Sequence, residues 1–233
     1  MKKILKLTMA LTALLITLPS TGSAAAWSSC DKWAIWANGG FYVENDVWGP
    51  YPGRQCIWAN SYKNWGVNAN HTGNRIQSYP NVDKKDINKR VLSLNNVYSS
   101  FNATTPSGTV YDLAYDVWLN GSTYEVMVWT KWANTQPIAA SYDARGIAVP
   151  SYRNQSIGGA TYNVYHRGNV TSFLRTSQIS SGSVNIKPLL QWINNVPRWY
   201  NNPTLAKVQF GWEIINTGGS KNFTMNSYSC TAN

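Results

Sequence analysis

The sequence predicts an all-β domain, a sandwich or barrel of short strands with a single helix on its outside. Three observations support this prediction. Alternating polar and apolar residues recur in short runs, Gly, Asn, Pro and Ser separate the runs, and one segment alone has helical spacing. The 233 residues show no internal repeat and no low-complexity linker, so we expect one domain.

The elements follow from this alternation. Strands are expected at 33–37, 40–47, 55–60, 75–79, 109–119, 123–132, 146–150, 161–166, 170–176, 207–215 and 222–229. The segment 188–195 differs, because Leu189, Leu190 and Ile193 recur at helical spacing. Pro188 suits a first helical turn, where its missing N–H is not needed.

The first 26 residues read as a secretory signal peptide and not as part of the fold. Lys2, Lys3 and Lys6 form a basic start, and the apolar run 4–18 is too short to span a membrane. Small residues then lead to a cleavage site expected after Ala24 or Ala26. The mature domain 27–233 is therefore expected to be soluble and secreted. Its charge falls from +10 to +7 because three lysines leave with the signal.

The composition favours a sugar ligand. Charged residues make up 13% and hydrophobic residues 43%, which excludes a disordered chain. Twelve Trp and 14 Tyr exceed what one core needs, and flat aromatic rings suit the faces of sugar rings. The basic residues are scattered, apart from a cluster within 84–90 that reads as a solvated face, so no nucleic-acid partner is expected.

Cysteine and histidine usage narrows the chemistry. Export to an oxidising compartment favours a disulfide between Cys30 and Cys56. Cys230 is left either as a free thiol or as a competitor for one of these partners. His71 and His166 lack zinc-site spacing, and the chain has no serine-hydrolase elbow or phosphate-binding loop. A structural zinc or zincin site, serine-triad hydrolysis and nucleotide chemistry therefore all lose support, and no cofactor is expected.

Two alternating runs meet at Asn120-Gly121, a favoured two-residue hairpin turn. With that turn as the loop, Asp116 faces Glu125. The same register sets Asp112 opposite Trp129. A four-residue loop would shift the register by two and leave the acids on the same face.

Like charges placed across a strand pair repel each other and raise one pKa. Three large apolar side chains, Trp118, Met127 and Trp129, share the face with these acids. An apolar-walled groove with acids on its floor accommodates both kinds of residue, and a solvated outer face is the alternative.

A second acid stands in the strand 207–215. Glu213 is a lone carboxylate in an otherwise apolar run, whose other face carries Val208, Phe210 and Trp212. Gly211 beside it would leave room for the close approach of a ligand. Paired in space with Glu125, Glu213 would complete a carboxylate couple, although a lone strand Glu is often just exposed.

These segments resemble glycoside hydrolase family 12, the compact β-jelly-roll endoglucanases and xyloglucanases. The matching segments are Cys30-Asp-Lys-Trp33, Tyr42-Val-Glu-Asn-Asp-Val-Trp-Gly49, Gln77-Ser-Tyr-Pro-Asn-Val82, Ala114-Tyr-Asp-Val-Trp118, Tyr124-Glu-Val-Met-Val-Trp129, Pro137-Ile138 and Gly211-Trp-Glu213. The resemblance implies two packed antiparallel sheets with a long open cleft on the concave face. It also matches Cys30 and Cys56 to the N-terminal cysteine pair of the family.

The resemblance implies roles for individual residues. Glu125 matches the nucleophile, Glu213 the general acid/base, and Asp116 the aspartate that hydrogen-bonds the nucleophile. Further matches to substrate-binding or cleft-lining positions are Trp48, Met127, Trp129 and Pro137, with Trp65 as another stacking platform. Asp46 and Asp112 stand where the family often has Asn, so sugar hydrogen bonds there would differ, and Trp212 replaces a smaller residue.

The implied activity is endo-acting hydrolysis of β-1,4-glucosidic bonds with retention, by two glutamates and without a metal. The expected partner is plant cell-wall β-glucan, with no nucleic acid, no membrane after signal cleavage, and a monomeric enzyme. Cellulose, mixed-linkage glucan and xyloglucan remain open as substrates. The alternatives are a non-catalytic carbohydrate-binding jelly roll and a xylanase of the related clan, which the E-x-M-x-W strand disfavours.

Overall fold

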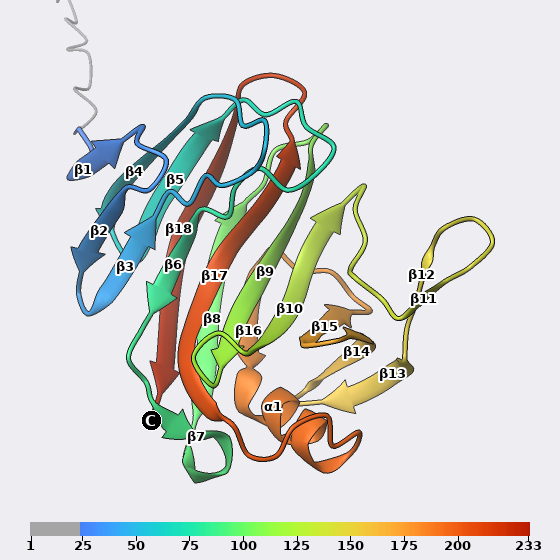
Figure 1. Cartoon of the computed structure of the whole chain (residues 1–233). Helices are drawn as coiled ribbons and strands as arrows, with labels where there is room; N and C mark the ends of the chain where they lie inside the picture. Colours follow the sequence, from blue (N-terminus) through green and yellow to red (C-terminus); the bar gives the residue numbers. More distant parts are fainter. Residues whose placement is uncertain (1–23) are drawn as a thin grey trace, which may run out of the picture.

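The computed structural model describes residues 24–233, so most of the expected signal segment lies outside the described residues. Strands dominate the chain (Figure 1). Their bounds are β1 (Trp27–Ser29), β2 (Ile35–Asn38), β3 (Phe41–Glu44), β4 (Gln55–Ser61), β5 (Asn64–Ala69), β6 (Asn81–Lys84), β7 (Lys89–Arg90), β8 (Val97–Thr104), β9 (Val110–Leu119), β10 (Tyr124–Ala133), β11 (Ser141–Tyr142), β12 (Ala148–Val149), β13 (Tyr152–Ile157), β14 (Ala160–Arg167), β15 (Val170–Arg175), β16 (Ser181–Asn185), β17 (Thr204–Asn216) and β18 (Lys221–Ala232).

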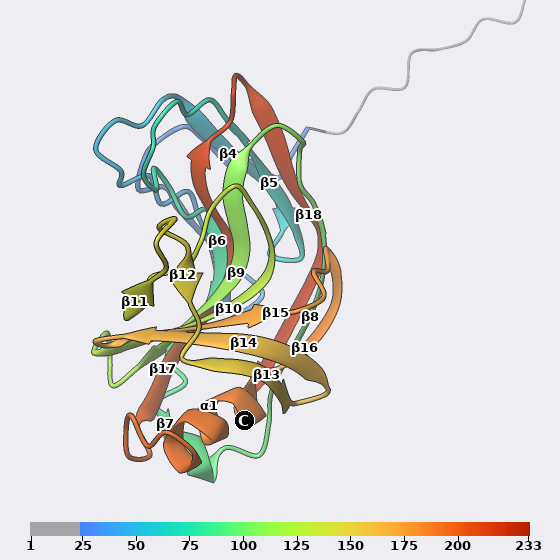
Figure 2. The ribbon, with the colours of Figure 1, turned by 90° about the vertical axis from the view of Figure 1, so that its right-hand side faces the viewer.

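Two large sheets form the layers of a jelly-roll sandwich, which confirms the predicted fold class. The six-stranded sheet has the order β1-β4-β5-β18-β8-β16. The ten-stranded sheet has the order β13-β14-β15-β10-β9-β17-β6-β3-β2, with β7 paired to the start of β17. Figure 2 shows the ten-stranded sheet bent, so that its outer face is concave.

The expectation of purely antiparallel sheets is wrong at one place, because β10 and β15 run parallel. Glu125 pairs with Val170 and Trp129 with Leu174 along this ladder. A parallel neighbour needs a long crossover connection. The chain supplies it through β11 to β14, which leave one end of β10 and return to the other.

The core lies between the two sheets, where the alternating runs bury their apolar faces. On β17, Val208, Phe210, Trp212 and Ile214 are all fully buried, as the alternation predicts. Each fully buried large side chain contributes about 1.5–3 kcal/mol relative to exposure. This face therefore determines which side chains of β17 point outward.

The predicted helix is α1 (Ile186–Asn195), which begins two residues earlier than expected. It buries Ile186, Leu189, Leu190 and Ile193 in one stripe. The helix packs at the end of the sandwich near β8 and β13 (Figure 1). A short 3-10 turn, η1 (Val91–Ser93), lies beside it.

The predicted strand at 75–79 is wrong, since only Ser78 forms isolated bridges there, to Val47 and Ile214. Several strands were not anticipated, namely β1, β5, β6, β7, β8, β11, β13 and β16. The sequence of β5 does alternate, with Trp65, Val67 and Ala69 on one face. That pattern was sufficient to predict the strand.

The cysteines form the bond that the sequence predicts. Cys30 and Cys56 form a disulfide with their Cα atoms 4.0 Å apart, which confirms the predicted pair. Cys230 is a buried free thiol on β18.

Within residues 24–233, no helix has the length and apolar character that crossing a membrane requires.

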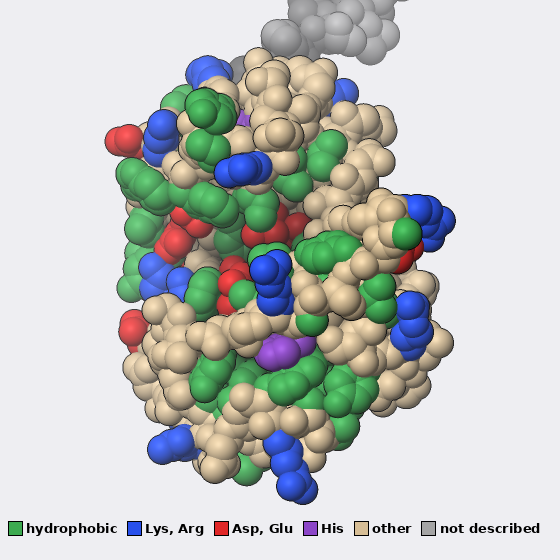
Figure 3. Space-filling model, turned by 45° about the vertical axis from the view of Figure 1, so that its right-hand side comes forward, with side chains coloured by type: hydrophobic (Ala, Val, Ile, Leu, Met, Phe, Trp, Pro, Cys, Tyr) green, Lys and Arg blue, Asp and Glu red, His purple; other side chains and the backbone are tan. Residues whose placement is uncertain are grey.

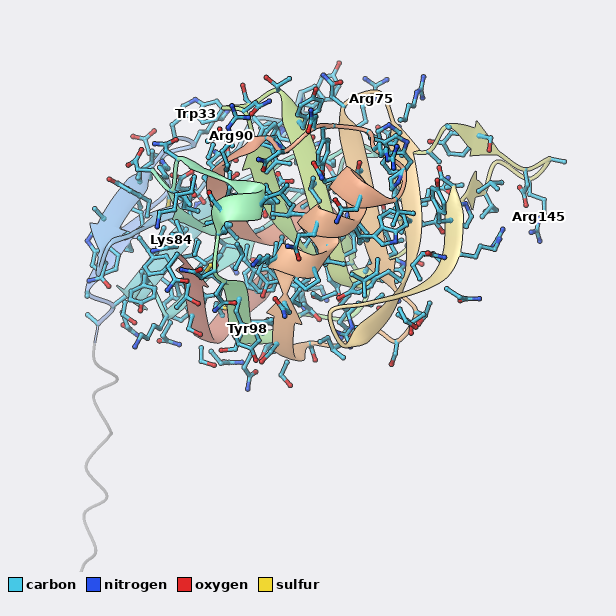
Figure 4. All side chains as sticks on the ribbon, turned by 90° about the horizontal axis from the view of Figure 1, so that it is seen from below. Trp33, Arg75, Lys84, Arg90, Tyr98 and Arg145 are labelled. Carbon is cyan, nitrogen blue, oxygen red and sulfur yellow. A yellow bond between two sulfur atoms is a disulfide. The ribbon has the colours of Figure 1, made fainter. Side chains whose placement is uncertain are left out.

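A small hairpin of β11 and β12 projects from the body of the molecule. Figure 4 shows Arg145 at its tip, far from the two large sheets. Asp143 organises the turn, because its Oδ1 atom accepts hydrogen bonds from the backbone N–H groups of Arg145 and Ile147, both at 2.9 Å. The segment between β10 and this hairpin contains Pro137 and borders the site described next.

Candidate active site

A cavity of about 530 Å³ opens on the outer, concave face of the ten-stranded sheet. Acidic side chains gather in the hollow and hydrophobic side chains border it (Figure 3). Its lining residues come from β3, β9, β10, β15, β17 and three loops: Glu44, Asp46, Trp48, Ile76, Tyr79, Asp112, Asp116, Trp118, Glu125, Met127, Trp129, Thr135, Gln136, Pro137, Ile138, Val170, Lys207, Gln209 and Glu213. The predicted groove with an acidic floor is therefore present.

The hairpin of β9 and β10 presents both acids to this cavity, but in a different register from the one expected. Glu125 lies opposite Trp118, and Asp116 lies opposite Met127. The prediction that Asp116 faces Glu125 directly is wrong by two residues, and so is the pairing of Asp112 with Trp129. Asp116 and Glu125 are diagonal neighbours on one face, still within reach of each other.

The turn explains the shift. The loop has four residues, because the Asn120 carbonyl accepts a hydrogen bond from the Thr123 N–H at 3.3 Å. Asn120 is also held by β17, where its Oδ1 atom accepts from the Thr204 N–H at 2.8 Å. Asn120 and Gly121 do adopt positive φ angles of 50° and 72°, as an Asn-Gly turn favours. Contacts with β17 thus hold the four-residue loop in place.

Asp116 and Glu125 form a hydrogen-bonded carboxyl pair. Burial raises the pKa of Glu125 above its ordinary value of 4.5, and the hydrogen bond from Asp116 opposes that rise. Burial and the charge of Glu125 raise the pKa of Asp116 well above 3.8. Asp116 therefore holds the shared proton and donates it in a hydrogen bond to Glu125, which leaves Glu125 as the anion.

Glu213 enters the same cavity from β17, on the far side of β9. Its strand partner is Asp112, and the two carboxyls share a hydrogen bond. Burial, the charge and hydrogen bond of Asp112, and the charge of Glu125 all raise the pKa of Glu213 well above 4.5. Of the two glutamates, Glu213 is therefore the one suited to carry a proton, while Glu125 is the one suited to be ionised.

Gly211 has a structural role that differs from the one expected. A Cβ atom there would lie 2.0 Å from the carbonyl oxygen of Pro80, so the glycine makes room for neighbouring backbone. Pro80 O accepts a hydrogen bond from the Trp212 N–H at 3.2 Å at the same place. The space over Gly211 is therefore occupied by the backbone of Pro80 and Asn81.

Aromatic and apolar side chains form the walls. Trp48 is 48% exposed at the rim, while Met127 and Trp129 are largely buried in the wall. The Trp129 indole N–H donates to the Met127 sulfur at 3.5 Å, which fixes both side chains. Pro137 and its exposed neighbour Ile138 line the cavity from the loop after β10. The structure thus brings these four predicted residues to the cavity.

The expectation for Trp65 is wrong. Its side chain is fully buried in the core and does not line the cavity. β5 belongs to the six-stranded sheet, and Trp65 points inward with Val67 and Ala69. A ring enclosed in the core cannot stack on a sugar.

The sequence analysis missed several lining residues, including Tyr79 and Lys207. Lys207 is six residues before Glu213 on β17, so its even spacing was a usable signal for the same face. Its ammonium lies 5.8 Å from the Trp118 ring centroid and 3.7 Å from Asp83 Oδ2. Tyr79 donates its hydroxyl to the Ala114 carbonyl at 3.1 Å. Its position in a loop offered no periodic signal.

Asp46, at the Trp48 end of the cavity, is a further acid of the lining. Burial and then the charge of Glu44 raise its pKa to about 6, against the opposing charges of Lys207 and Lys85. It has a positive φ of 41°, a conformation that Asp and Asn tolerate better than most residues.

Comparison with known proteins identifies the family to which this site belongs. The family model "Glycosyl hydrolase family 12" matches residues 39–233. The chain belongs to glycosyl hydrolase family 12. This family 12 chain is therefore a hydrolase, which favours the enzyme over the non-catalytic binding module.

Solved and curated relatives agree with the family assignment. The xyloglucanase domain of NopAA, a type three effector from Sinorhizobium fredii determined with cellobiose, is 37% identical to this family 12 chain. Its TM-score is 0.85 over 90% of this chain and 100% of that chain. A probable xyloglucan-specific endo-β-1,4-glucanase A from Aspergillus fumigatus is 25% identical, over 92% of this chain and 95% of its own. Endoglucanase S from Pectobacterium parmentieri is 23% identical, over 91% and 89%.

Proposed function

We propose that this family 12 hydrolase cuts internal β-1,4-glucosidic bonds of glucans with net retention of configuration. Glu125 is the nucleophile, Glu213 is the general acid/base, and Asp116 hydrogen-bonds the nucleophile. One observation carries the proposal: Glu125 and Glu213 line the same cavity, where burial raises the pKa of both, the hydrogen bond from Asp116 opposes that rise for Glu125, and the hydrogen bond with Asp112 adds to it for Glu213.

The first step forms a glycosyl ester. The Glu125 carboxylate attacks the anomeric carbon as the bond to the glycosidic oxygen breaks, and Glu213 gives its proton to that oxygen. Asp116 donates a hydrogen bond to Glu125, so it orients the attacking carboxylate and offsets the burial that would otherwise protonate it. The leaving chain departs with a free hydroxyl.

The second step releases the enzyme. Glu213, now a carboxylate, takes a proton from water while the water oxygen attacks the anomeric carbon and the ester bond to Glu125 breaks. Each step inverts the anomeric centre once, so the product has the configuration of the substrate. Glu213 regains its proton, and both carboxyls return to their starting states.

The cavity walls provide substrate binding. Trp48 offers an exposed ring on which a sugar can stack, and Met127, Trp129 and Pro137 enclose the reacting sugar. Binding energy from the more distant sugars can then be used to distort the sugar at the reacting centre. Near Trp48, Asp46 has a carboxyl group where the family often has the amide of Asn. As a carboxylate it accepts hydrogen bonds from sugar hydroxyls, whereas an amide could also donate them.

The names of the relatives support a β-glucan substrate, and the relative with 37% identity is a xyloglucanase. We therefore expect xyloglucan to be cleaved, with cellulose and mixed-linkage glucan as the comparison substrates.

We also propose that residues 1–26 direct secretion and are removed, since they combine a basic start, an apolar run and small residues. The polysaccharide would then meet the mature enzyme outside the cell.

Azide rescue tests the assignment of roles. Glu125→Ala removes the nucleophile, so azide should attack from the vacated side and give a glycosyl azide of inverted configuration. Glu213→Ala should still form the ester from a substrate with a very acidic leaving group, and azide should then give a retained product. The anomeric configuration of each product is read by NMR.

Two outcomes would overturn the roles. Rescue of Glu125→Ala with retention would show that another residue is the nucleophile. More than a few per cent of residual polymer hydrolysis in Glu125→Ala would show the same. Release of reducing sugar from xyloglucan, mixed-linkage glucan and cellulose then identifies the preferred polymer.

A further inference from the structure

Asp112 is placed directly against Glu213 by the pairing of β9 with β17. Its side chain is 1% exposed, and its carboxyl is hydrogen-bonded to that of Glu213. Both residues line the cavity. The site therefore contains two carboxyl pairs, Asp116 with Glu125 and Asp112 with Glu213, on either side of β9.

The two pairs differ in which residue carries the proton, the aspartate or the glutamate. In the first, the proton stays on the aspartate and the glutamate is the anion. In the second, burial is the largest influence and raises the pKa of both carboxyls well above their ordinary values, while the hydrogen bond between them raises the pKa of Glu213 further and lowers that of Asp112. The proton therefore stays on the glutamate, and Asp112 is the anion that accepts its hydrogen bond.

Within residues 24–233, the other titratable groups that act on this second pair come from β9, β10 and the loop before β6. From β9 and β10, Asp116 and Glu125 add negative charge. Tyr79, from the loop before β6, also interacts with Asp112 and Glu213, and burial together with these acids raises its pKa well above 10.0, so it stays neutral. Lys207 on β17 acts on Asp116 and Asp46. Among the described residues, the charged groups that act most on the pKa values of Asp112 and Glu213 are acids.

We propose that Asp112 is a positioning residue that acts through Glu213: its buried carboxylate accepts the hydrogen bond of the protonated Glu213 carboxyl and keeps the proton there until the glycosidic oxygen takes it. This inference rests on the proposed function, because it needs Glu213 as the acid/base. It assigns Asp112 a different role from the sugar contact that the family resemblance implied.

The same arrangement serves the second chemical step. When Glu213 has given its proton to the leaving oxygen, two buried carboxylates face each other. Their repulsion makes Glu213 a stronger base toward water, and the pair relaxes when Glu213 takes the proton of that water. The proton thus leaves with the first product and returns from water, and Asp112 keeps its charge throughout.

The test is the pH profile of Asp112→Asn. Asparagine keeps the size and loses the charge, so Glu213 should lose its proton at lower pH. The high-pH limb of kcat/KM on a glucan should move down by about one pH unit or more. Asp86→Asn is the matched control, because Asp86 is exposed and has a positive φ of 58° that Asn also tolerates. Its limb should stay where it is in the wild type.

A dinitrophenyl β-cellobioside separates the two roles of Asp112. Its leaving group needs no proton, so ester formation in Asp112→Asn should match the wild type more closely than polymer hydrolysis does. If Asp112 only bound the sugar, Asp112→Asn would instead raise KM at every pH on both substrates. The high-pH limb of kcat/KM would then stay where it is in the wild type. That result would overturn the proposal.

A measurement on the wild type keeps the inference testable if Asp112→Asn fails to fold. Carbon NMR of the side-chain carboxyls should show Glu213 losing its proton at a higher pH than Asp112. The reverse order would overturn the inference. If Glu213→Ala kept full polymer hydrolysis, the proposed function itself would fail. If Glu213→Ala lost activity but Asp112→Asn left the high-pH limb of kcat/KM unchanged, the role of Asp112 would be wrong and the proposed function would stand.

Discussion

Trp212 and Trp65 meet edge to face in the core, with ring centroids 5.3 Å apart and ring planes inclined at 72°. Trp212 directly precedes Glu213 on β17, so its burial fixes the direction in which the Glu213 side chain leaves the strand. The two sheets meet at this contact, since Trp65 belongs to the six-stranded sheet and Trp212 to the ten-stranded one.

Trp65→Ala should therefore behave as a core mutation. We expect a loss of about 3–5 kcal/mol in the free energy of unfolding, the range for large-to-small changes at buried aromatic sites. Urea denaturation followed by Trp fluorescence measures it. KM on xyloglucan should remain close to the wild-type value where the variant is still folded. A Trp65→Ala variant that stayed stable but had a tenfold higher KM would show that Trp65 stacks on a sugar after all.

Trp48→Ala should show the opposite behaviour. Trp48 is exposed at the cavity rim, so its removal leaves the core intact and takes away a stacking surface. We expect KM to rise about three- to tenfold, as for the loss of one aromatic contact, with little change in Tm. Tyr51→Ala is the matched control, since Tyr51 is 80% exposed and outside the lining. Equal effects of both variants on KM would contradict a specific role for Trp48.

Asp116→Asn should weaken catalysis without abolishing it. Asp116 donates a hydrogen bond to the Glu125 carboxylate and takes no part in bond making or breaking. A hydrogen bond to a charged group contributes about 1.5–3 kcal/mol, and the Asn amide can still donate one to Glu125, so the fall in kcat/KM should stay below about a hundredfold. Steady-state kinetics beside Glu125→Ala checks this. A loss as complete as that of Glu125→Ala would mean that Asp116 acts directly in the reaction.

Stability should fall as the solution becomes acidic, and His71 should contribute to the fall. His71 Nδ1 accepts a hydrogen bond from the Gly53 N–H at 3.1 Å, so a second ring proton would break that bond. Burial lowers its pKa from 6.5 to about 4. The unfolded chain then binds the extra proton between these values, and the stabilisation present above pH 6.5 is lost as pH falls toward 4.

His71→Gln should flatten the pH dependence of the unfolding free energy between pH 4 and 6.5. Urea denaturation at several pH values measures the slope. His166→Gln is the comparison, because His166 is only partly buried and should flatten the slope less. An unchanged slope in His71→Gln would assign the acid sensitivity to other groups.

The sequence by itself determined which side chains share a face. Successive residues of a strand point to opposite sides, so Glu125, Met127 and Trp129 had to share one face whatever the loop length. The family motifs then distinguished the cleft face from the core face. Trp65 shows what was overlooked, since its own strand alternates as plainly as the hairpin does.

Only the tertiary structure decided the pairing between strands. The four-residue loop is held by β17 through Asn120, and no local pattern near the turn shows that contact. The Asp112–Glu213 pair joins strands about a hundred positions apart in sequence, and its register depends on that loop and on core packing such as Trp212 against Trp65. Alternation is a property of each strand's backbone and can be read locally. Register minimises the energy of contacts between distant segments, so it is decided only when the whole sandwich packs.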